Sequence, residues 1–165
     1  MKAIYAGSFS PPTLGHLDLI RRAAARFDEV IVAVAGQSEK QYLFSLETRA
    51  DMLRRVIGDS PGVRVVISTG LLVDTARQEG ADILLRGLRD ASDLPFELQL
   101  ADANRQISGF ETLFFPALPQ YSRISSSIVR DCALHGAPID GMVPEEIIND
   151  IYAAYGRVSQ TGREC

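Results

Sequence analysis

The residues best suited to chemistry stand near the amino terminus, in the segment Gly7-Ser8-Phe9-Ser10-Pro11-Pro12-Thr13-Leu14-Gly15-His16. An apolar run precedes this segment and apolar residues at helical spacing follow it, which indicates a strand, a Gly/Pro loop and a helix. Backbone N–H groups at a helix start favour anions, phosphate above all. His16 would lie in the first helical turn, where its ring can donate a hydrogen bond without a permanent charge. The segment predicts a phosphate-binding loop; the alternative is a plain turn with a helix-end histidine.

The rest of the chain alternates short apolar runs with amphipathic segments. Strands are predicted at residues 2–6, 29–35, 63–67, 83–85 and 112–115. Helices are predicted at residues 14–27, 45–57, 71–79, 93–107, 125–134 and 144–155, with Ser45, Asp93 and one of three serines at 125–127 as N-caps. This alternation predicts an α/β fold, a doubly wound, Rossmann-like parallel sheet of five strands with helices at the carboxyl terminus. We expect one domain over residues 1–155 and a flexible tail over 156–165.

Polar and cationic residues follow several of the predicted strands. Lys40 follows the second strand, Arg86 and Arg89 follow the fourth, and Tyr121 and the three serines follow the fifth. Ligands of such sheets bind beyond the carboxyl ends of the strands. Two guanidinium groups offer forked donors for phosphate oxygens, and serines at a helix start offer hydroxyls and free N–H groups. For each there is a plainer interpretation: solvated lysine, surface ion pairs and ordinary caps. Leu72 fits a core position or a pocket wall equally well.

The overall composition limits the partners and the compartment. The 165 residues carry a formal net charge of −4, which argues against general nucleic-acid binding. We expect no membrane segment and no signal peptide. Cys132 and Cys165 lack a C-x-x-C partner, so neither a disulfide framework nor a zinc site is expected. These features predict a cytoplasmic protein that acts on small molecules.

Several motifs resemble those of the phosphopantetheine adenylyltransferase family, within the nucleotidylyltransferase superfamily. They are Tyr5-Ala6-Gly7-Ser8-Phe9, Thr13-Leu14-Gly15-His16, Leu85-Arg86-Gly87-Leu88-Arg89, Phe96-Glu97-Leu98-Gln99-Leu100-Ala101-Asp102-Ala103-Asn104 and Ile124-Ser125-Ser126-Ser127-Ile128-Val129. The T-x-G-H piece marks the superfamily, and R-G-L-R followed by E-x-Q-x-A-x-x-N is more specific. The resemblance extends from Lys2 to about Tyr155.

The resemblance implies a nucleotidyltransferase of coenzyme A synthesis. ATP and 4′-phosphopantetheine would give dephospho-CoA and pyrophosphate, with Mg²⁺, by direct in-line attack and without a covalent intermediate. It also implies a homohexamer and feedback inhibition by CoA. The metal ligands are left unknown. The alternatives are a sibling adenylyl- or cytidylyltransferase with another phosphate acceptor, and a nucleotide-binding module without turnover.

The resemblance also implies roles for particular residues. His16, Lys40 and Ser8 would be catalytic, with His16 stabilising the transition state at the α-phosphate. The acceptor 4′-phosphopantetheine would be bound by Ser8, Lys40, Leu72 and Arg86. ATP would be bound by Ser8, Phe9, His16, Gly87, Leu88, Arg89, Glu97, Tyr121, Ser122, Arg123, Ile124, Ser125, Ser126 and Ser127. The chain departs from the family at Ser10, where an aspartate is usual, so an electrostatic or metal role at that position is in doubt.

Overall fold

The structure, a computed structural model, describes residues 1–36 and 43–157. The strands are β1 (Lys2–Gly7), β2 (Glu29–Ala35), β3 (Val63–Ser68), β4 (Ile83–Leu88) and β5 (Thr112–Pro116). The helices are α1 (Leu14–Ala24), α2 (Leu46–Ile57), α3 (Leu72–Gln78), α4 (Leu94–Ser108), α5 (Ser126–His135) and α6 (Ile148–Ala153), with a 3₁₀ turn at Glu145–Ile147 before α6. None of the helices in these described ranges is long and apolar enough to cross a membrane.

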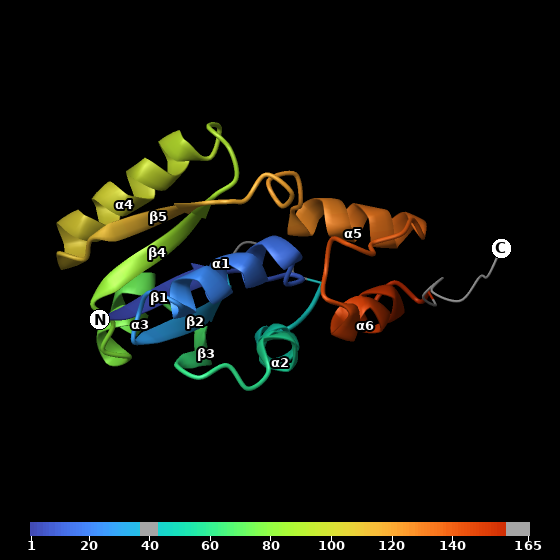
Figure 1. Ribbon diagram of the computed structural model, residues 1–165, viewed down its shortest axis with the longest axis horizontal. Helices are drawn as coiled ribbons and strands as arrows, with labels where there is room; N and C mark the ends of the chain where they lie inside the picture. The colour runs from blue at the N-terminus through green and yellow to red at the C-terminus, as the bar shows by residue number, and fades with distance from the viewer. Residues whose placement is uncertain (37–42, 158–165) are drawn as a thin grey trace.

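The five strands form one parallel sheet in the order β3-β2-β1-β4-β5 (Figure 1). The chain winds outward from β1 to β3 and then returns to the other side of β1 with β4. This reversal between β1 and β4 is the topological switch point, where ligands of such sheets bind. The prediction of a doubly wound five-stranded parallel sheet is therefore confirmed.

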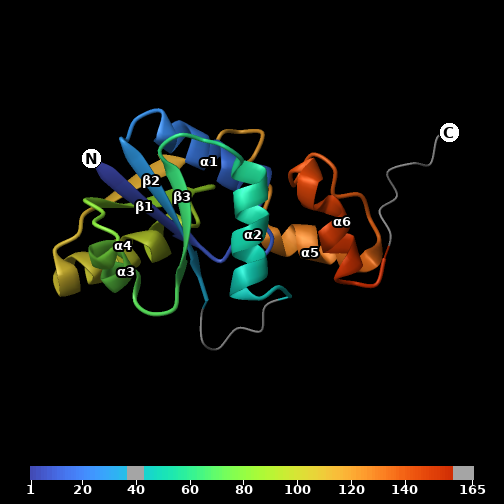
Figure 2. The same ribbon diagram turned by 90° about the horizontal axis from the view of Figure 1, so that it is seen from below.

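Alternating residues of the buried strands separate two apolar layers. In β2, Val30, Val32 and Val34 pack with residues of α1 and α2, whereas Ile31 and Ala33 pack with residues of α3. Because successive side chains of a strand point to opposite faces, one β-branched run supplies both layers. Figure 2 shows α2 and α3 on opposite sides of the sheet.

A third apolar cluster joins α5 and α6 to the helices of the first layer. Leu17 of α1 and Met52 of α2 pack with Val129 of α5 and Ile151 of α6, and all four are almost fully buried. The N–H of Leu14 also donates to the carbonyl of Met142 at 2.9 Å. This packing brings the amino end of α5 beside the loop that follows β1, although the two are more than 100 residues apart in sequence.

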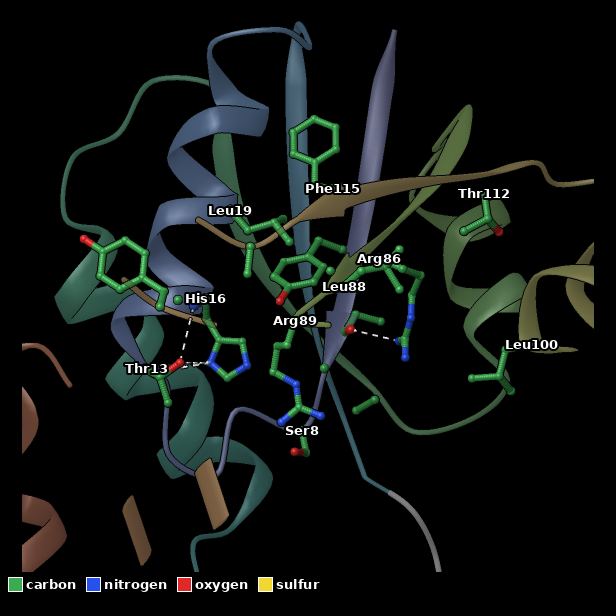
Figure 3. Close-up of a pocket in the computed structure, with 18 of the residues that line it drawn as sticks. Ser8, Thr13, His16, Leu19, Arg86, Leu88, Arg89, Leu100, Thr112 and Phe115 are labelled. Carbon is green, nitrogen blue, oxygen red and sulfur yellow. Dashed lines mark hydrogen bonds between the residues drawn. The ribbon is translucent and has the colours of Figure 1, made fainter. Parts of the chain in front are cut away.

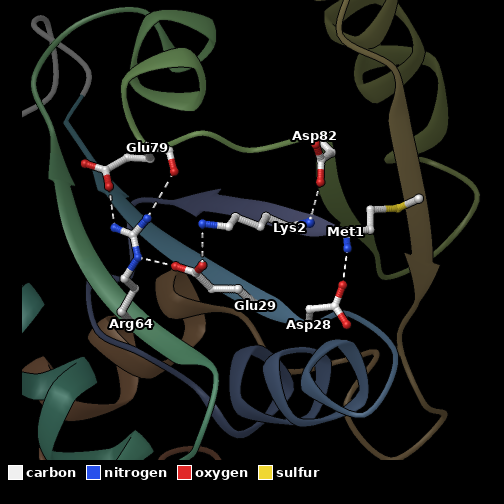
Figure 4. Close-up of polar contacts among 7 residues, drawn as sticks. All are labelled: Met1, Lys2, Asp28, Glu29, Arg64, Glu79 and Asp82. Carbon is white, nitrogen blue, oxygen red and sulfur yellow. Dashed lines mark hydrogen bonds and ion pairs between the residues drawn. The ribbon is translucent and has the colours of Figure 1, made fainter.

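Ion pairs join the amino ends of the strands, at the edge of the sheet away from the loop that follows β1. Arg64 of β3 pairs with Glu29 of β2 and with Glu79 after α3, and Lys2 of β1 pairs with Glu29 at 2.9 Å (Figure 4). The side chains of Lys2 and Arg64 are more than a third exposed, so each pair contributes little alone. Together they connect three adjacent strands at this edge.

Some predicted boundaries were wrong. Helix α1 ends at Ala24 rather than at residue 27, because the chain turns there and stacks Phe27 on Phe115, with ring centroids 6.5 Å apart. Strand β4 continues three residues beyond 85, because Arg86 and the next two residues pair with β5. The final predicted helix is a 3₁₀ turn and a short helix.

The predicted caps had mixed outcomes. Ser45 and Ser125 accept the N–H groups of Thr48 and Ile128, which confirms them as N-caps. Asp93 makes no side-chain cap, because its carboxylate accepts from Arg89 instead. Most of the predicted tail, 158–165, lies outside the described residues.

Candidate active site

Two pockets of about 550 and 380 Å³ open beyond the carboxyl ends of β1 and β4. The larger one extends to β5 and α4, and the smaller one lies against the amino end of α5. Ser8, His16, Arg89 and Ile124 line both pockets. The groups most suited to contact a phosphate therefore lie where the two pockets meet.

His16 is held by Thr13, the N-cap of α1. The Thr13 hydroxyl accepts the His16 N–H at 3.4 Å, and the Thr13 N–H donates to Nδ1 of His16 at 3.0 Å (Figure 3). These reciprocal bonds satisfy two free donors of the helix start. A ring nitrogen that accepts a backbone N–H carries no proton, so the neutral imidazole is protonated at Nε2. The cap thus leaves an N–H donor on the side of the ring away from Thr13.

The surroundings of His16 disfavour its charged form. Burial and the nearby positive charge of Arg89 lower the pKa of His16 from 6.5 to about 4. Figure 3 shows the Arg89 side chain beside the imidazole ring. His16 is therefore a neutral hydrogen-bond donor at pH 7, as expected from the sequence.

Phe9 supports the His16 ring from behind. Its side chain is fully buried and makes edge contacts with the rings of Tyr5 and His16, at centroid distances of 5.5 and 5.0 Å. The backbone of Phe9 has a positive φ of 45°, which is strained for a bulky residue. A Cβ at Gly7 would lie 3.0 Å from the Phe9 ring, so a larger residue there would require the ring to shift by a few tenths of an ångström. The residue was predicted to bind ATP, but the structure places its side chain in the core.

Arg49 of α2 is a site residue that the sequence analysis missed. The side chain is almost fully buried, and its Nη1 donates to the carbonyls of Ser8 at 2.6 Å and Ala35 at 3.1 Å. It thereby fixes the ends of β1 and β2 relative to each other. A signal was present: Arg49 shares the apolar stripe of α2 with Met52, Leu53 and Val56, where a charged residue needs buried partners.

Arg86 within β4 and Arg89 directly after it each pair with a carboxylate. Arg86 donates through Nε and Nη2 to Glu97 at 2.6 and 2.7 Å, and Arg89 donates through the same atoms to Asp93 at 3.0 and 2.8 Å. Burial lowers the pKa of Arg86, but the hydrogen bonds and charge of Glu97 outweigh it and raise the pKa. Arg86 and Arg89 both line the larger pocket, so they are charged donors of fixed direction.

The smaller pocket is rich in hydroxyl groups. The hydroxyl of Ser126 donates to the Pro11 carbonyl at 2.8 Å, and Arg130 donates to the Ser10 carbonyl at 2.6 Å and to the Ser127 hydroxyl at 3.2 Å. These bonds attach the start of α5 to the loop that follows β1. The Ser10 hydroxyl is buried and has no partner among the described residues. Arg130 was not among the residues predicted for the site from the sequence.

The structure brings together most of the predicted site residues. Those that line one or both pockets are Ser8, His16, Leu72, Arg86, Gly87, Leu88, Arg89, Tyr121, Ile124, Ser125, Ser126 and Ser127. Phe9, Glu97, Ser122 and Arg123 are not among the lining residues. Lys40 lies outside the described residues. The residues that line the larger pocket also include some that were not predicted, among them Arg22, Leu100, Ala101 and Asn104.

Comparison with known proteins finds nucleotidyltransferases by sequence and by fold. Residues 4–132 match the model of the cytidylyltransferase-like family. A phosphopantetheine adenylyltransferase of Symbiobacterium thermophilum is 48% identical over 87% of this chain and 90% of its own length. A phosphopantetheine adenylyltransferase of Moorella thermoacetica is 46% identical over 93% of this chain and 97% of its own length. A crystal structure of a putative nicotinate-nucleotide adenylyltransferase from Vibrio parahaemolyticus shares the fold, with a TM-score of 0.69 at 17% identity over 95% of this chain and 96% of the other.

The protonation state of His16 gives a prediction. In a His135→Asn background, which leaves one histidine signal, the imidazole resonances should keep their neutral, Nε2-protonated positions from pH 8 to about 5. They should move only as the pH approaches about 4, measured by NMR titration of ¹⁵N-labelled protein. A midpoint near 6.5 would contradict the prediction.

The lowered pKa of His16 also makes the stability of the folded protein depend on pH. The folded state resists protonation of His16 and the unfolded state does not, so stability falls as the pH drops from 6.5 towards 4. A His16→Asn variant, whose amide oxygen can still accept the Thr13 N–H, should lose less stability over this interval in urea unfolding. Equal losses of stability in the wild-type and His16→Asn proteins would show that protonation of His16 is not the cause of the loss.

Proposed function

This chain belongs to the phosphopantetheine adenylyltransferases of the cytidylyltransferase-like family, and we propose that it transfers the adenylyl group of ATP to 4′-phosphopantetheine. The products are dephospho-CoA and pyrophosphate. The observation that carries the proposal is the neutral Nε2–H donor of His16 at the junction of two pockets that are lined by cations and hydroxyls. One pocket can hold the acceptor phosphate while the other holds the departing phosphates of ATP.

The proposed reaction is an in-line attack of the acceptor phosphate on the α-phosphorus of ATP. No carboxylate is among the described residues that line the two pockets, and a phosphate monoester needs no general base to act as a nucleophile. Catalysis then rests on positioning and on stabilising the charge that develops on the phosphoryl oxygens. His16 donates to the α-phosphoryl group, and Arg89 provides positive charge beside it.

The remaining substrate groups are assigned by their position. Arg86, with Lys40, binds the acceptor phosphate, and Leu72 contacts the pantetheine arm. Ser126, Ser127 and the amino end of α5 receive the β- and γ-phosphates, because helix starts bind anions. Arg130, which lines the same pocket, adds a cation there.

Magnesium enters this proposal as part of the nucleotide. The described lining residues offer hydroxyls and cations but no carboxylate, which suits Mg²⁺ held by ATP phosphates and water rather than by the protein. Ser10, where the family usually has aspartate, agrees with this donor set. The ion would neutralise charge on the phosphates. We also propose that the protein acts in the cytoplasm.

The first test is pyrophosphate release from Mg-ATP. The wild-type protein should release it with 4′-phosphopantetheine, and neither CTP in place of ATP nor nicotinate mononucleotide as acceptor should support turnover. Turnover with a different acceptor only would replace the proposed substrate. ATP binding without any turnover would support a nucleotide-binding module instead.

His16 variants test the proposed donor. His16→Ala and His16→Asn should each lower kcat by about 10²–10³, the effect of removing one oxyanion donor, with little change in ATP affinity. The Asn variant separates catalysis from helix capping, because it can keep the bond to the Thr13 N–H. Near-normal turnover in the Asn variant would show that His16 is not the donor that stabilises the α-phosphoryl group.

We propose that the chain assembles into a homohexamer, as the family resemblance implies. Support comes from apolar side chains left exposed on α4 and β5, namely Leu94, Phe96, Leu98, Ile107 and Leu113. Ile107→Glu should reduce the mass measured by sedimentation velocity, whereas Leu134→Glu, exposed on α5, should not. A wild-type monomer, or equal masses for all three proteins, would contradict the proposal.

Feedback by CoA is also proposed. CoA contains the pantetheine arm, so it should compete for the pocket that Leu72 and Arg86 line. In rate measurements, CoA should raise the apparent KM for 4′-phosphopantetheine and leave kcat unchanged. Inhibition that lowers kcat alone would refute competition at this site.

A further inference from the structure

The smaller pocket carries a positive charge that no carboxylate of the described residues neutralises. Its lining includes Arg89 and Arg130, and no acidic side chain is among its described lining residues. Arg89 is paired with Asp93, whereas Arg130 forms no ion pair within the part of the chain that the structure describes. Arg130 donates instead to the Ser10 carbonyl at 2.6 Å and to the Ser127 hydroxyl at 3.2 Å. The charge of this guanidinium is therefore left for a ligand.

The amino end of α5 adds free donors to the same pocket. The first N–H groups of a helix have no partner inside the helix, and the helix dipole favours an anion beside them. The Ser125 hydroxyl caps the N–H of Ile128, but the N–H groups of Ser126 and Ser127 have no partner among the described residues. All three serines line the pocket, whose volume of about 380 Å³ is that of a small-ligand site. Together with Arg130, these donors suit a compact polyanion.

Ser10 sets the charge of the pocket wall beside Arg130. It is 1% exposed and lines the pocket, and its hydroxyl has no hydrogen-bond partner among the described residues. A buried hydroxyl without a partner is costly, which points to an oxygen atom of a ligand or an ordered water that completes the site. The Ser10 carbonyl accepts from Arg130, so a carboxylate at position 10 would lie close to this guanidinium and neutralise it. The neutral hydroxyl leaves the cation to the ligand.

We propose that the smaller pocket binds pyrophosphate without a metal ion, and that the neutral side chain of Ser10 makes this possible. The proposal rests on the proposed function, in which pyrophosphate is a product. Mg²⁺ prefers oxygen ligands, carboxylates among them, and the described lining residues supply no carboxylate. Mg²⁺ lowers the negative charge of pyrophosphate, so it weakens the attraction to Arg130 without gaining a carboxylate ligand from the pocket. Free pyrophosphate therefore binds at least as tightly as its magnesium complex.

The test is isothermal titration with inorganic pyrophosphate, in EDTA and in excess MgCl₂. For the wild-type protein, the Kd in EDTA should equal the Kd in MgCl₂ or be lower. Ser10→Asp should raise the Kd in EDTA by roughly 10–100-fold, because it adds a like charge beside the anion, and MgCl₂ should recover most of this loss. Ser10→Asn has nearly the same size and no charge, so it should lose much less affinity. A wild-type Kd that falls when Mg²⁺ is added, or equal losses for Ser10→Asp and Ser10→Asn, would overturn the proposal.

Arginine variants show whether the anion binds in the smaller pocket. Arg130→Gln should raise the Kd for free pyrophosphate by roughly 10–100-fold, the effect of losing a charged hydrogen-bond donor. Arg26→Gln is the matched control, because Arg26 is exposed after α1 and lines neither pocket, and it should leave the Kd unchanged. In a Ser10→Asp background, Arg130→Gln should raise the Kd little further, since the carboxylate has already neutralised the guanidinium. Equal effects of the Arg130 and Arg26 variants would place the anion elsewhere and refute the proposal.

Titration with the product separates this proposal from the reaction, because it needs neither ATP nor an acceptor. If the wild-type protein releases no pyrophosphate from ATP with any acceptor, the proposed function fails, while tight binding of pyrophosphate in EDTA still supports the pocket. If the protein turns over but does not bind pyrophosphate in EDTA, the proposed function stands and this proposal fails. If Ser10→Asp does not fold, the wild-type titrations with and without Mg²⁺ and the Arg130→Gln variant decide the result.

Discussion

The reciprocal hydrogen bonds between Thr13 and His16 are the interaction on which the site depends. They begin α1, fix the orientation of the imidazole and determine which of its nitrogens carries the proton. Each neighbouring feature preserves this arrangement. Phe9 fills the space behind the ring, and Arg49 holds the backbone of the loop that precedes it. One helix cap thereby serves both folding and chemistry.

The cations around the site are held in direction as well as in place. Arg22, Arg86 and Arg89 all line the larger pocket, and each has a carboxylate partner, namely Asp18, Glu97 and Asp93. Such pairs are close to neutral overall, so they contribute less to long-range attraction than unpaired arginines would. Their benefit is geometric, because a paired guanidinium meets a phosphate with its remaining donors already oriented. Such short-range hydrogen bonds do not require a positive net charge, and the chain carries a net charge of −4.

Much of the fold could be predicted from the sequence because its signals are local. The apolar run of β2 was located to the residue, Ser45 was identified as a cap, and the cap expected among the three serines at 125–127 is Ser125. The site residues of the loops were found because they follow buried strands. The extension of β4 was missed because it depends on pairing with β5. Asp93 is at the expected N-cap position, but its side chain does not cap α4 because it accepts from Arg89, outside the helix.

The supporting residues were harder to predict for the same reason. Arg49 acts through a partner far away in the chain, Ser8, and a sequence pattern shows only that a charged residue is in an apolar position. The role of Arg130 depends on α5 packing beside the loop after β1, which only the tertiary structure shows. Periodicity predicts elements, but it does not predict which elements meet.

The neutral state of His16 has a consequence for the end of the reaction cycle. A charged imidazolium would attract pyrophosphate at a distance and in every orientation, and it would slow the departure of this product. A neutral N–H donor interacts strongly only at short range and along one direction, so its hold weakens as soon as pyrophosphate shifts away. In the proposed reaction, the burial that removes the charge of His16 would therefore also ease the departure of pyrophosphate.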